Sequence, residues 1–445
     1  MEKRGVFMWK KKMTAVVLSL ALIVSCFSFS SDWTVSAEGE QTEGVAGITE
    51  ENRYSGIKNV IFMIGDGMGP NQVSVAAQTN DAELAMERMA VKGTVCTNNV
   101  QGLLTDSAAA GTALSTGVKT TNGTVAKDAD DHQIQTMLEY FAERNKKTGL
   151  VTTSYLLDAT PATFGAHASN RTSYTYIAKG YFKNQISVLL GGGLDGFLAE
   201  TRDFETGKSI TLLDYAKKIG YQYVSDLTEL QNAEGEMVLG LFAHHCMNYE
   251  EERSPKEPSI ADMTKQAISL LSENEDGFFL MVEAGNIDHA GHANNLSYSV
   301  GDTIAFSEAV EVALEFLNDN PDTLLIVTAD HETGGLICVD DNYAYSTTDH
   351  SNVEVPYYVA GKGAKYFRDL TDNTEISLKV RQAATELDPE WIAENRDYGK
   401  AILIGTIGLL GIVALGGCFF WKRKRRRKES QAIVKDKVAR QTGVQ

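Results

Sequence analysis

Four apolar runs of strand length are each followed or ended by an acidic residue, the residue type that metal ions use as a ligand. The pairs are NVIFMI (59–64) with Asp66, TGLVTTS (148–154) with Asp158, FFLMVE (278–283) with Glu283, and TLLIVTA (323–329) with Asp330. One aspartate after a strand is usually a turn residue or a helix cap. Open α/β sheets, however, bind ligands outside the carboxyl ends of their strands. Four acidic residues at such positions therefore predict a metal cluster.

The spacing of the histidines supports this prediction. Asp288 and His292 stand four residues apart, so one helical turn presents both to a single ion. Asp330 and His331 are adjacent, which suits two ligands at a tight turn. Mixed carboxylate and imidazole ligation is typical of zinc rather than calcium. An oxygen-only set suits magnesium instead, and the candidates for it are Asp66, Thr160 and Glu283.

A serine and an arginine could act on a phosphate. TDSAAAGTA (105–113) places Ser107 at the start of a small-residue helix, where free N–H groups favour an anion. The alternative for Ser107 is an ordinary N-cap. No G-x-S-x-G elbow surrounds it, but a metal ion on its oxygen would activate it without a histidine. Arg171 could grip two oxygens of a phosphate through its guanidinium fork, or could be a solvated surface side chain.

The elements that must position these residues indicate an α/β protein. The apolar runs are continuous rather than alternating, as in strands of a parallel sheet that helices cover on both faces. Helical patterns stand between them at 133–147, 259–274 and 302–318. This alternation predicts one large layered domain over residues 38–398.

The two ends of the 445-residue chain differ from this domain. A basic stretch (1–12), an apolar stretch (13–25) and V-S-A ending at Ala37 form the pattern of a signal peptide over 1–37. Cys26 after Ile-Val-Ser also fits a lipoprotein box, so the mature start stays open. Residues 401–421 carry no charge and are long enough for a transmembrane helix. The basic tail 422–445, which begins KRKRRRK, is then cytoplasmic, and the domain lies outside the membrane.

Composition excludes several classes of protein. The chain is 43% hydrophobic and 22% charged, which excludes a disordered chain and a polytopic membrane protein. The net charge is +3 for residues 1–37, +8 for 422–445 and −29 for the middle. Such an acidic middle segment would repel nucleic acid. The five cysteines form no C-x-x-C pair, so no cysteine zinc site is indicated.

Six strings occur in the order found in the alkaline phosphatase family, and the chain resembles that family from about residue 58 to about 364. The strings are NVIFMIGDGMG, TDSAAAGTA, DATPATFGAH with a following arginine, MVEAGNIDHAGH, TADHETGG and TTDHSNVEVP. The resemblance implies a three-layer α/β sandwich around a large, mostly parallel sheet. It also implies a phosphomonoesterase that works through a phosphoserine, with two zinc ions and one magnesium ion.

The resemblance assigns a role to each matched position. Ser107 would be the nucleophile and Arg171 the phosphate clamp. One zinc would be held by Asp288, His292 and His350, and the other by Asp66, Asp330 and His331. Asp66, Thr160 and Glu283 would hold magnesium, with Asp158 contacting its waters and Arg171.

The sequence also argues against three alternative functions, those of a sulfatase, a phosphodiesterase and a binding module without catalysis. Ser107-Ala-Ala-Ala lacks the sulfatase motif, and Arg171 argues against a phosphodiesterase. A binding module without catalysis would be expected to have lost ligands, and none of the matched ligands is missing.

Only 18 residues separate His331 from His350. Members with a large crown insertion there use it in the dimer interface, so a homodimer is left open. Small phosphate monoesters are the expected partners.

Overall fold

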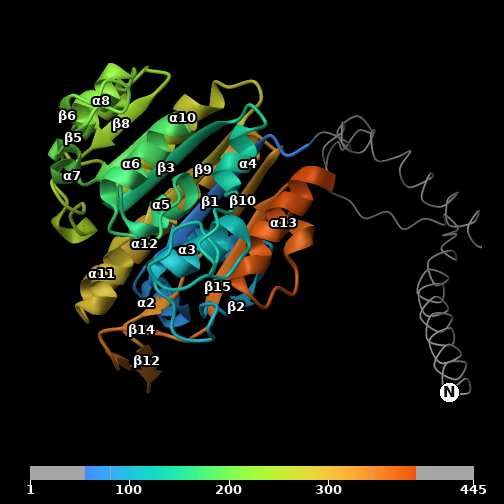
Figure 1. Cartoon of the computed structure of the whole chain (residues 1–445). Helices are drawn as coiled ribbons and strands as arrows, with labels where there is room; N and C mark the ends of the chain where they lie inside the picture. The colour runs from blue at the N-terminus through green and yellow to red at the C-terminus, as the bar shows by residue number, and fades with distance from the viewer. Residues whose placement is uncertain (1–55, 81, 341, 387–445) are drawn as a thin grey trace, which may run out of the picture. The chain divides into compact units, whose positions relative to one another are not determined.

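The computed structural model describes residues 56–80, 82–340 and 342–386 (Figure 1). Within these ranges, no helix combines the length and the apolar character that crossing a bilayer requires. The predicted signal peptide (1–37), the predicted span (401–421) and the basic tail lie outside the described residues. They stay predictions.

A nine-stranded sheet forms the centre, in the order β2-β15-β10-β1-β9-β3-β4-β8-β7. The strands are β1 (Asn59–Gly65), β2 (Val91–Val95), β3 (Lys147–Tyr155), β4 (Val188–Gly192), β7 (Gln222–Val224), β8 (Val238–Leu241), β9 (Phe278–Ala284), β10 (Thr323–Thr328) and β15 (Val355–Gly361). The run from β10 to β7 is parallel, and β15 is antiparallel to both of its neighbours. The four predicted strands and the mostly parallel sheet are confirmed.

Helices cover both faces of this sheet. They include α2 (Pro70–Thr79), α3 (Ser107–Thr116), α4 (Met137–Ala142), α5 (Ala159–Gly165), α10 (Ile260–Ser272), α12 (Leu296–Asp319) and α13 (Asn373–Glu386). Alternate side chains of β9 show the two layers. The Phe279 ring stacks on Phe141 of α4 at 5.5 Å, whereas Phe278 contacts Phe316 of α12 at 5.6 Å. Successive strand residues point to opposite faces, so the predicted three-layer α/β sandwich is confirmed (Figure 1).

Two predicted helices have different limits from those expected. The pattern at 133–147 yields only Met137–Ala142, because Thr136 caps the helix in a capping box and Asn145 adopts a positive φ of 59°. The pattern at 302–318 begins earlier, at Leu296, where the Asn295 side chain accepts a hydrogen bond from the Tyr298 N–H. Local capping and turn conformations, rather than apolar periodicity, set these limits.

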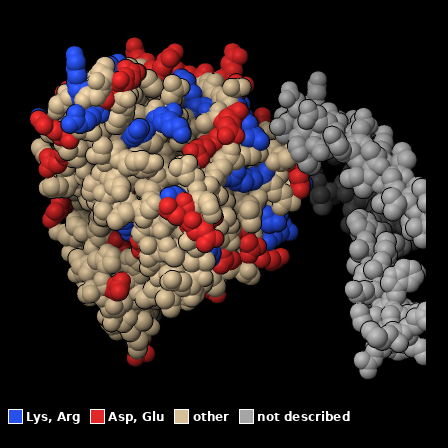
Figure 2. All heavy atoms as spheres, viewed as in Figure 1, with Lys and Arg blue, Asp and Glu red and all other residues tan. Residues whose placement is uncertain are grey.

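Register brings the predicted ligands to one edge of the sheet. Ile64 lies opposite Glu283 of β9 on one side and Thr328 of β10 on the other. Asp66 and Asp330 each lie two residues further along, so they emerge side by side. On the face drawn in Figure 2, basic and acidic side chains of the described residues are interspersed, without a broad basic surface.

Candidate metal centre

All the residues predicted for the site lie at or near the carboxyl edge of the sheet. Asp66 follows β1, Glu283 belongs to β9, and Asp330 and His331 follow β10. Asp288 and His292 are on α11 (Asn286–His292), and His350 is on β14 (His350–Ser351). Ser107 begins α3, Asp158 and Thr160 lie at the start of α5, and Arg171 lies in the segment after α5. Gly67 allows the first turn, because its φ is +75° and a Cβ there would lie 2.7 Å from the Cα of Asp288.

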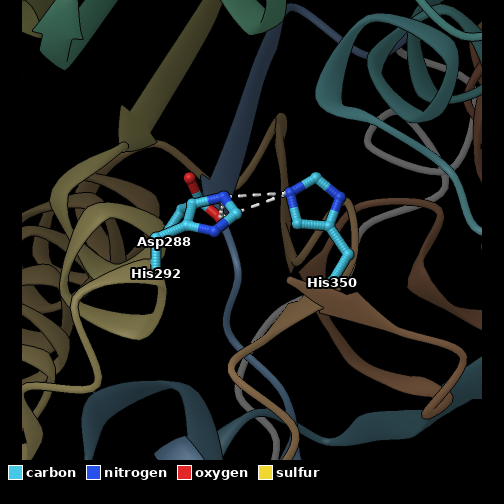
Figure 3. A group of neighbouring side chains, drawn as sticks. All are labelled: Asp288, His292 and His350. Carbon is cyan, nitrogen blue, oxygen red and sulfur yellow. Dashed lines mark hydrogen bonds and ion pairs between the residues drawn. The ribbon is translucent and has the colours of Figure 1, made fainter. Parts of the chain in front are cut away.

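Asp288, His292 and His350 converge on one point (Figure 3). Oδ1 of Asp288 lies 3.4 Å from Nε2 of His292 and 3.7 Å from Nε2 of His350. The Nδ1 atoms of the two rings are hydrogen-bonded to backbone carbonyls, to Thr348 O at 2.6 Å and to Thr105 O at 2.8 Å. A carbonyl only accepts, so each Nδ1 donates, and each Nε2 is the nitrogen left to bind a metal ion. That is a ligand set for a divalent cation.

The second group that could hold an ion is Asp66, Asp288 and His331, so Asp288 borders both groups, and the predicted ligand Asp330 lies beside His331. Nε2 of His331 lies 3.6 Å from Asp66 Oδ1 and 3.2 Å from Asp330 Oδ2. Both oxygens are buried and accept no hydrogen bond from any described residue. Asp330 uses its other oxygen, Oδ1, for the backbone N–H groups of Gly67 and His331, at 3.3 and 2.9 Å. Unpaired buried carboxylate oxygens are costly unless a cation joins them.

The electrostatics of this second set point the same way. Burial and the neighbouring carboxylates raise the pKa of Asp66 and of Asp330. Burial, with His350 and His292 close by, lowers the pKa of His331 well below its ordinary value, so its ring is neutral. With its pKa raised to about 8, the Asp330 carboxyl would be largely protonated at neutral pH if no cation were bound. The residues therefore fit a bound metal ion better than an empty cluster.

The oxygen-rich set lies beside Asp66. The Thr160 hydroxyl donates to Asp66 Oδ2 at 3.3 Å, and the Thr152 hydroxyl donates to Glu283 at 2.5 Å. Burial raises the pKa of Glu283 to about 7. Asp158 is the N-cap of α5 and accepts hydrogen bonds from the Ala159 N–H and the Ser154 hydroxyl. Asp158 also contacts Arg171.

Ser107 is not the N-cap of its helix. Asp106 is the cap, accepting from the Ala109 N–H at 2.9 Å, and Ser107 is the first helical residue. Its Oγ lies 3.3 Å from Nε2 of His331, at the second ligand set. The small residues of α3 allow close packing on α5, since a Cβ on Gly111 would lie 2.6 Å from the Thr163 hydroxyl.

Arg171 is held between two carboxylates, that of Asp106, the chain neighbour of Ser107, and that of Asp158. Its NH1 group lies 3.1 Å from Asp106 Oδ2, and its NH2 group lies 3.1 Å from Asp158 Oδ1. The sequence analysis did not predict that Asp106 pairs with Arg171, although its position before a helix and next to Ser107 is typical of an N-cap. It also missed Thr333, whose hydroxyl donates to Asp288 Oδ1 at 2.5 Å.

A buried carboxyl group outside the ligand sets predicts a pH effect on stability. Asp302 on α12 is 5% exposed, and burial raises its pKa to about 7. The folded protein then keeps a proton that the unfolded chain releases near pH 4, so this group's stabilisation is lost as pH rises from about 4 to about 7. We expect Asp302→Asn to be more stable than the parent at pH 8, by up to roughly 4 kcal/mol, and close to it at pH 5. Thermal unfolding at both values, with metal ions supplied, measures this. An equal difference at the two values would contradict it.

Known proteins resemble the chain over most of the described region. The family model described as alkaline phosphatase matches residues 57–341. Identity to alkaline phosphatase 3 of Bacillus subtilis is 38% over 339 residues, which is 73% of this chain and 71% of that protein. Identity to the alkaline phosphatase of Escherichia coli is 35% over 380 residues, covering 73% of this chain and 80% of that protein.

Solved structures give the same picture. A variant of the alkaline phosphatase from the Antarctic bacterium TAB5, solved with magnesium bound in its M3 site, aligns with a TM-score of 0.67. Its sequence identity is 30%, and the match covers 74% of this chain and 99% of that one.

Proposed function

The chain belongs to the alkaline phosphatase family of phosphoric monoester hydrolases, and on that premise we propose that it hydrolyses phosphate monoesters through a phosphoserine formed at Ser107. The observation that carries the proposal is the place of Ser107 Oγ. It lies 3.3 Å from His331 Nε2, and Asp106, the residue before Ser107, pairs with the Arg171 guanidinium, as does Asp158.

We assign the metal ions to the three groups of side chains described above. Asp288, His292 and His350 would hold one zinc ion, and Asp66, Asp330 and His331 the other. Asp66, Thr160 and Glu283 would hold magnesium, with Asp158 as an outer contact. When bound, these ions supply Lewis-acid stabilisation of the serine, leaving-group and phosphate oxygens.

Arg171, Ser107 and the start of α3 each have a separate role in the reaction. Arg171 donates to two non-bridging oxygens of the phosphate and presents the phosphorus to Ser107. The Ser107 hydroxyl gives up its proton to solvent as its oxygen bonds to phosphorus, the bond to the alcohol oxygen breaks, and the departing alcohol takes up a proton from solvent. Water then attacks the phosphoserine, the Ser107 oxygen leaves and regains a proton, and inorganic phosphate is released. The start of α3 offers free N–H groups next to the developing negative charge.

We also propose that the enzyme acts outside the cytoplasm. The support is the predicted signal peptide over 1–37, the predicted span over 401–421 and the basic tail after it. We expect broad use of monoesters, because the residues assigned above act on the phosphate rather than on its alcohol.

The test is hydrolysis of a chromogenic aryl phosphate by purified residues 38–398, measured against pH. We expect turnover that rises above pH 8, falls when metal ions are stripped, returns with zinc and magnesium, and is inhibited by inorganic phosphate. A phosphate diester and a sulfate ester serve as matched controls and should react much more slowly. No monoester turnover with both zinc sites filled would contradict the proposal, and faster diester cleavage would assign the site to phosphodiesterase chemistry.

A further inference from the structure

One fully buried carboxylate near the metal centre has no part in the proposed mechanism. Glu332 follows His331 directly, in β11 (Glu332–Thr333), and is 1% exposed. No cation contacts it among the described residues. Instead it accepts hydrogen bonds from four donors: Gln72 Nε2, the backbone N–H groups of Gly335 and Leu336, and the Ser351 hydroxyl.

These donors belong to three separate segments, and each segment also carries a metal-ligand candidate. Gln72 lies on α2, six residues after Asp66, and reaches Glu332 Oε1 at 2.8 Å. Gly335 and Leu336 form the turn that leaves the sheet after His331, with N–O distances of 3.1 and 3.0 Å. Ser351 is the neighbour of His350 on the segment that returns. Glu332 thus joins the outgoing and returning ends of the loop that presents His350.

The chemistry of the four donors requires a carboxylate. Each oxygen takes two of them: Gln72 and Leu336 at Oε1, Gly335 and Ser351 at Oε2. A glutamine here would turn an NH2 group toward two of the donors and leave at least one backbone N–H, that of Gly335 or Leu336, unpaired. The space is also filled, since a Cβ on Gly69 would lie 2.3 Å from the Glu332 Cγ.

We propose that Glu332 is a positioning residue that holds His350 in place for its metal ion. Backbone pairing supports this coupling, because Glu332 lies opposite Ser351 and Thr333 lies opposite His350 in the β11–β14 ladder. The inference rests on the proposed function, in that it takes His350 as a zinc ligand. Partners of metal ligands typically change metal affinity by about 10- to 100-fold when they are replaced.

The experiment compares zinc release from the full-length holoenzyme and from Glu332→Gln, with a chromogenic chelator in excess. We expect one of the two zinc ions to leave about 10- to 100-fold faster from the variant, and the absorption bands of the cobalt-substituted protein to change for one site only. Ser351→Ala, which removes a single donor and leaves the fold less perturbed, should act in the same direction. The two substitutions should not add, because they break the same contact.

Asp203→Asn is the matched control. That carboxyl group is also buried and accepts from the backbone N–H groups of Glu205 and Thr206. Unlike Glu332 it also pairs with a lysine, Lys218, at 2.8 Å, and it lies in the loop between β5 (Glu200–Arg202) and β6 (Ser209–Thr211). It should leave zinc release unchanged. Equal zinc release from the parent, Glu332→Gln and Ser351→Ala would overturn the proposal. Failure of the proposed function is a different result, namely a zinc-loaded parent protein without monoesterase turnover. A parent that binds no zinc would overturn both.

Discussion

Replacement of Ser107 by alanine is expected to lower kcat for an aryl phosphate by at least about a thousandfold while both zinc ions remain bound. Loss of a nucleophile typically costs between 10³- and 10⁶-fold, because the residual rate depends on binding and electrostatics alone. Among the described residues, the Ser107 side chain makes no hydrogen bond apart from its 3.3 Å contact with His331. Its loss should therefore leave thermal stability and metal content nearly unchanged.

The measurement pairs steady-state kinetics with elemental analysis of the purified variant. Ser115→Ala is the matched control, since Ser115 lies on the same helix, is equally buried, and donates only to the Thr112 carbonyl, at 3.3 Å. Trapping of radioactive phosphate on the parent protein, and its absence from Ser107→Ala, would identify the intermediate. Full activity in Ser107→Ala would contradict the assignment of Ser107 as the nucleophile, but not the assignment of the metal ligands.

His350→Ala is expected to remove one zinc ion per chain and to reduce kcat/KM by at least about a thousandfold, because several kcal/mol of charge stabilisation is lost with the ion. The His350 ring joins both ligand sets. Its Nε2 lies 3.2 Å from that of His292, and its ring stacks on His331 at 3.6 Å. The second zinc should remain bound, though more weakly.

Elemental analysis of the dialysed variant checks this prediction, and added imidazole gives a further test. Imidazole can enter the space left by the side chain and should restore part of both zinc content and turnover. His132→Ala is the control, because His132 is exposed and pairs only with Asp128 on the surface. An unchanged zinc count in His350→Ala would refute the assignment of His350.

Much of the site could be predicted from the sequence, and the reason is topological. Asp66, Glu283 and Asp330 were recognised because each follows or ends an apolar run. Parallel strands deliver their carboxyl ends to one edge, so position along each strand was enough to predict that these residues meet. Asp288 and His292 were predicted as a pair because helical periodicity alone sets their spacing.

Only the tertiary structure decided which side chains hold these residues in place. Arg171 pairs with Asp106 across 65 residues, and Gln72 reaches Glu332 across 260. No local pattern encodes such partners, because hydrogen bonds depend on side-chain geometry after the strands have packed. The same holds for the antiparallel β15, whose apolar run looks like that of any buried strand. The sequence by itself determined the types of the site residues and their place at the carboxyl edge of the sheet. The packing of the folded chain determined how each of these side chains is oriented.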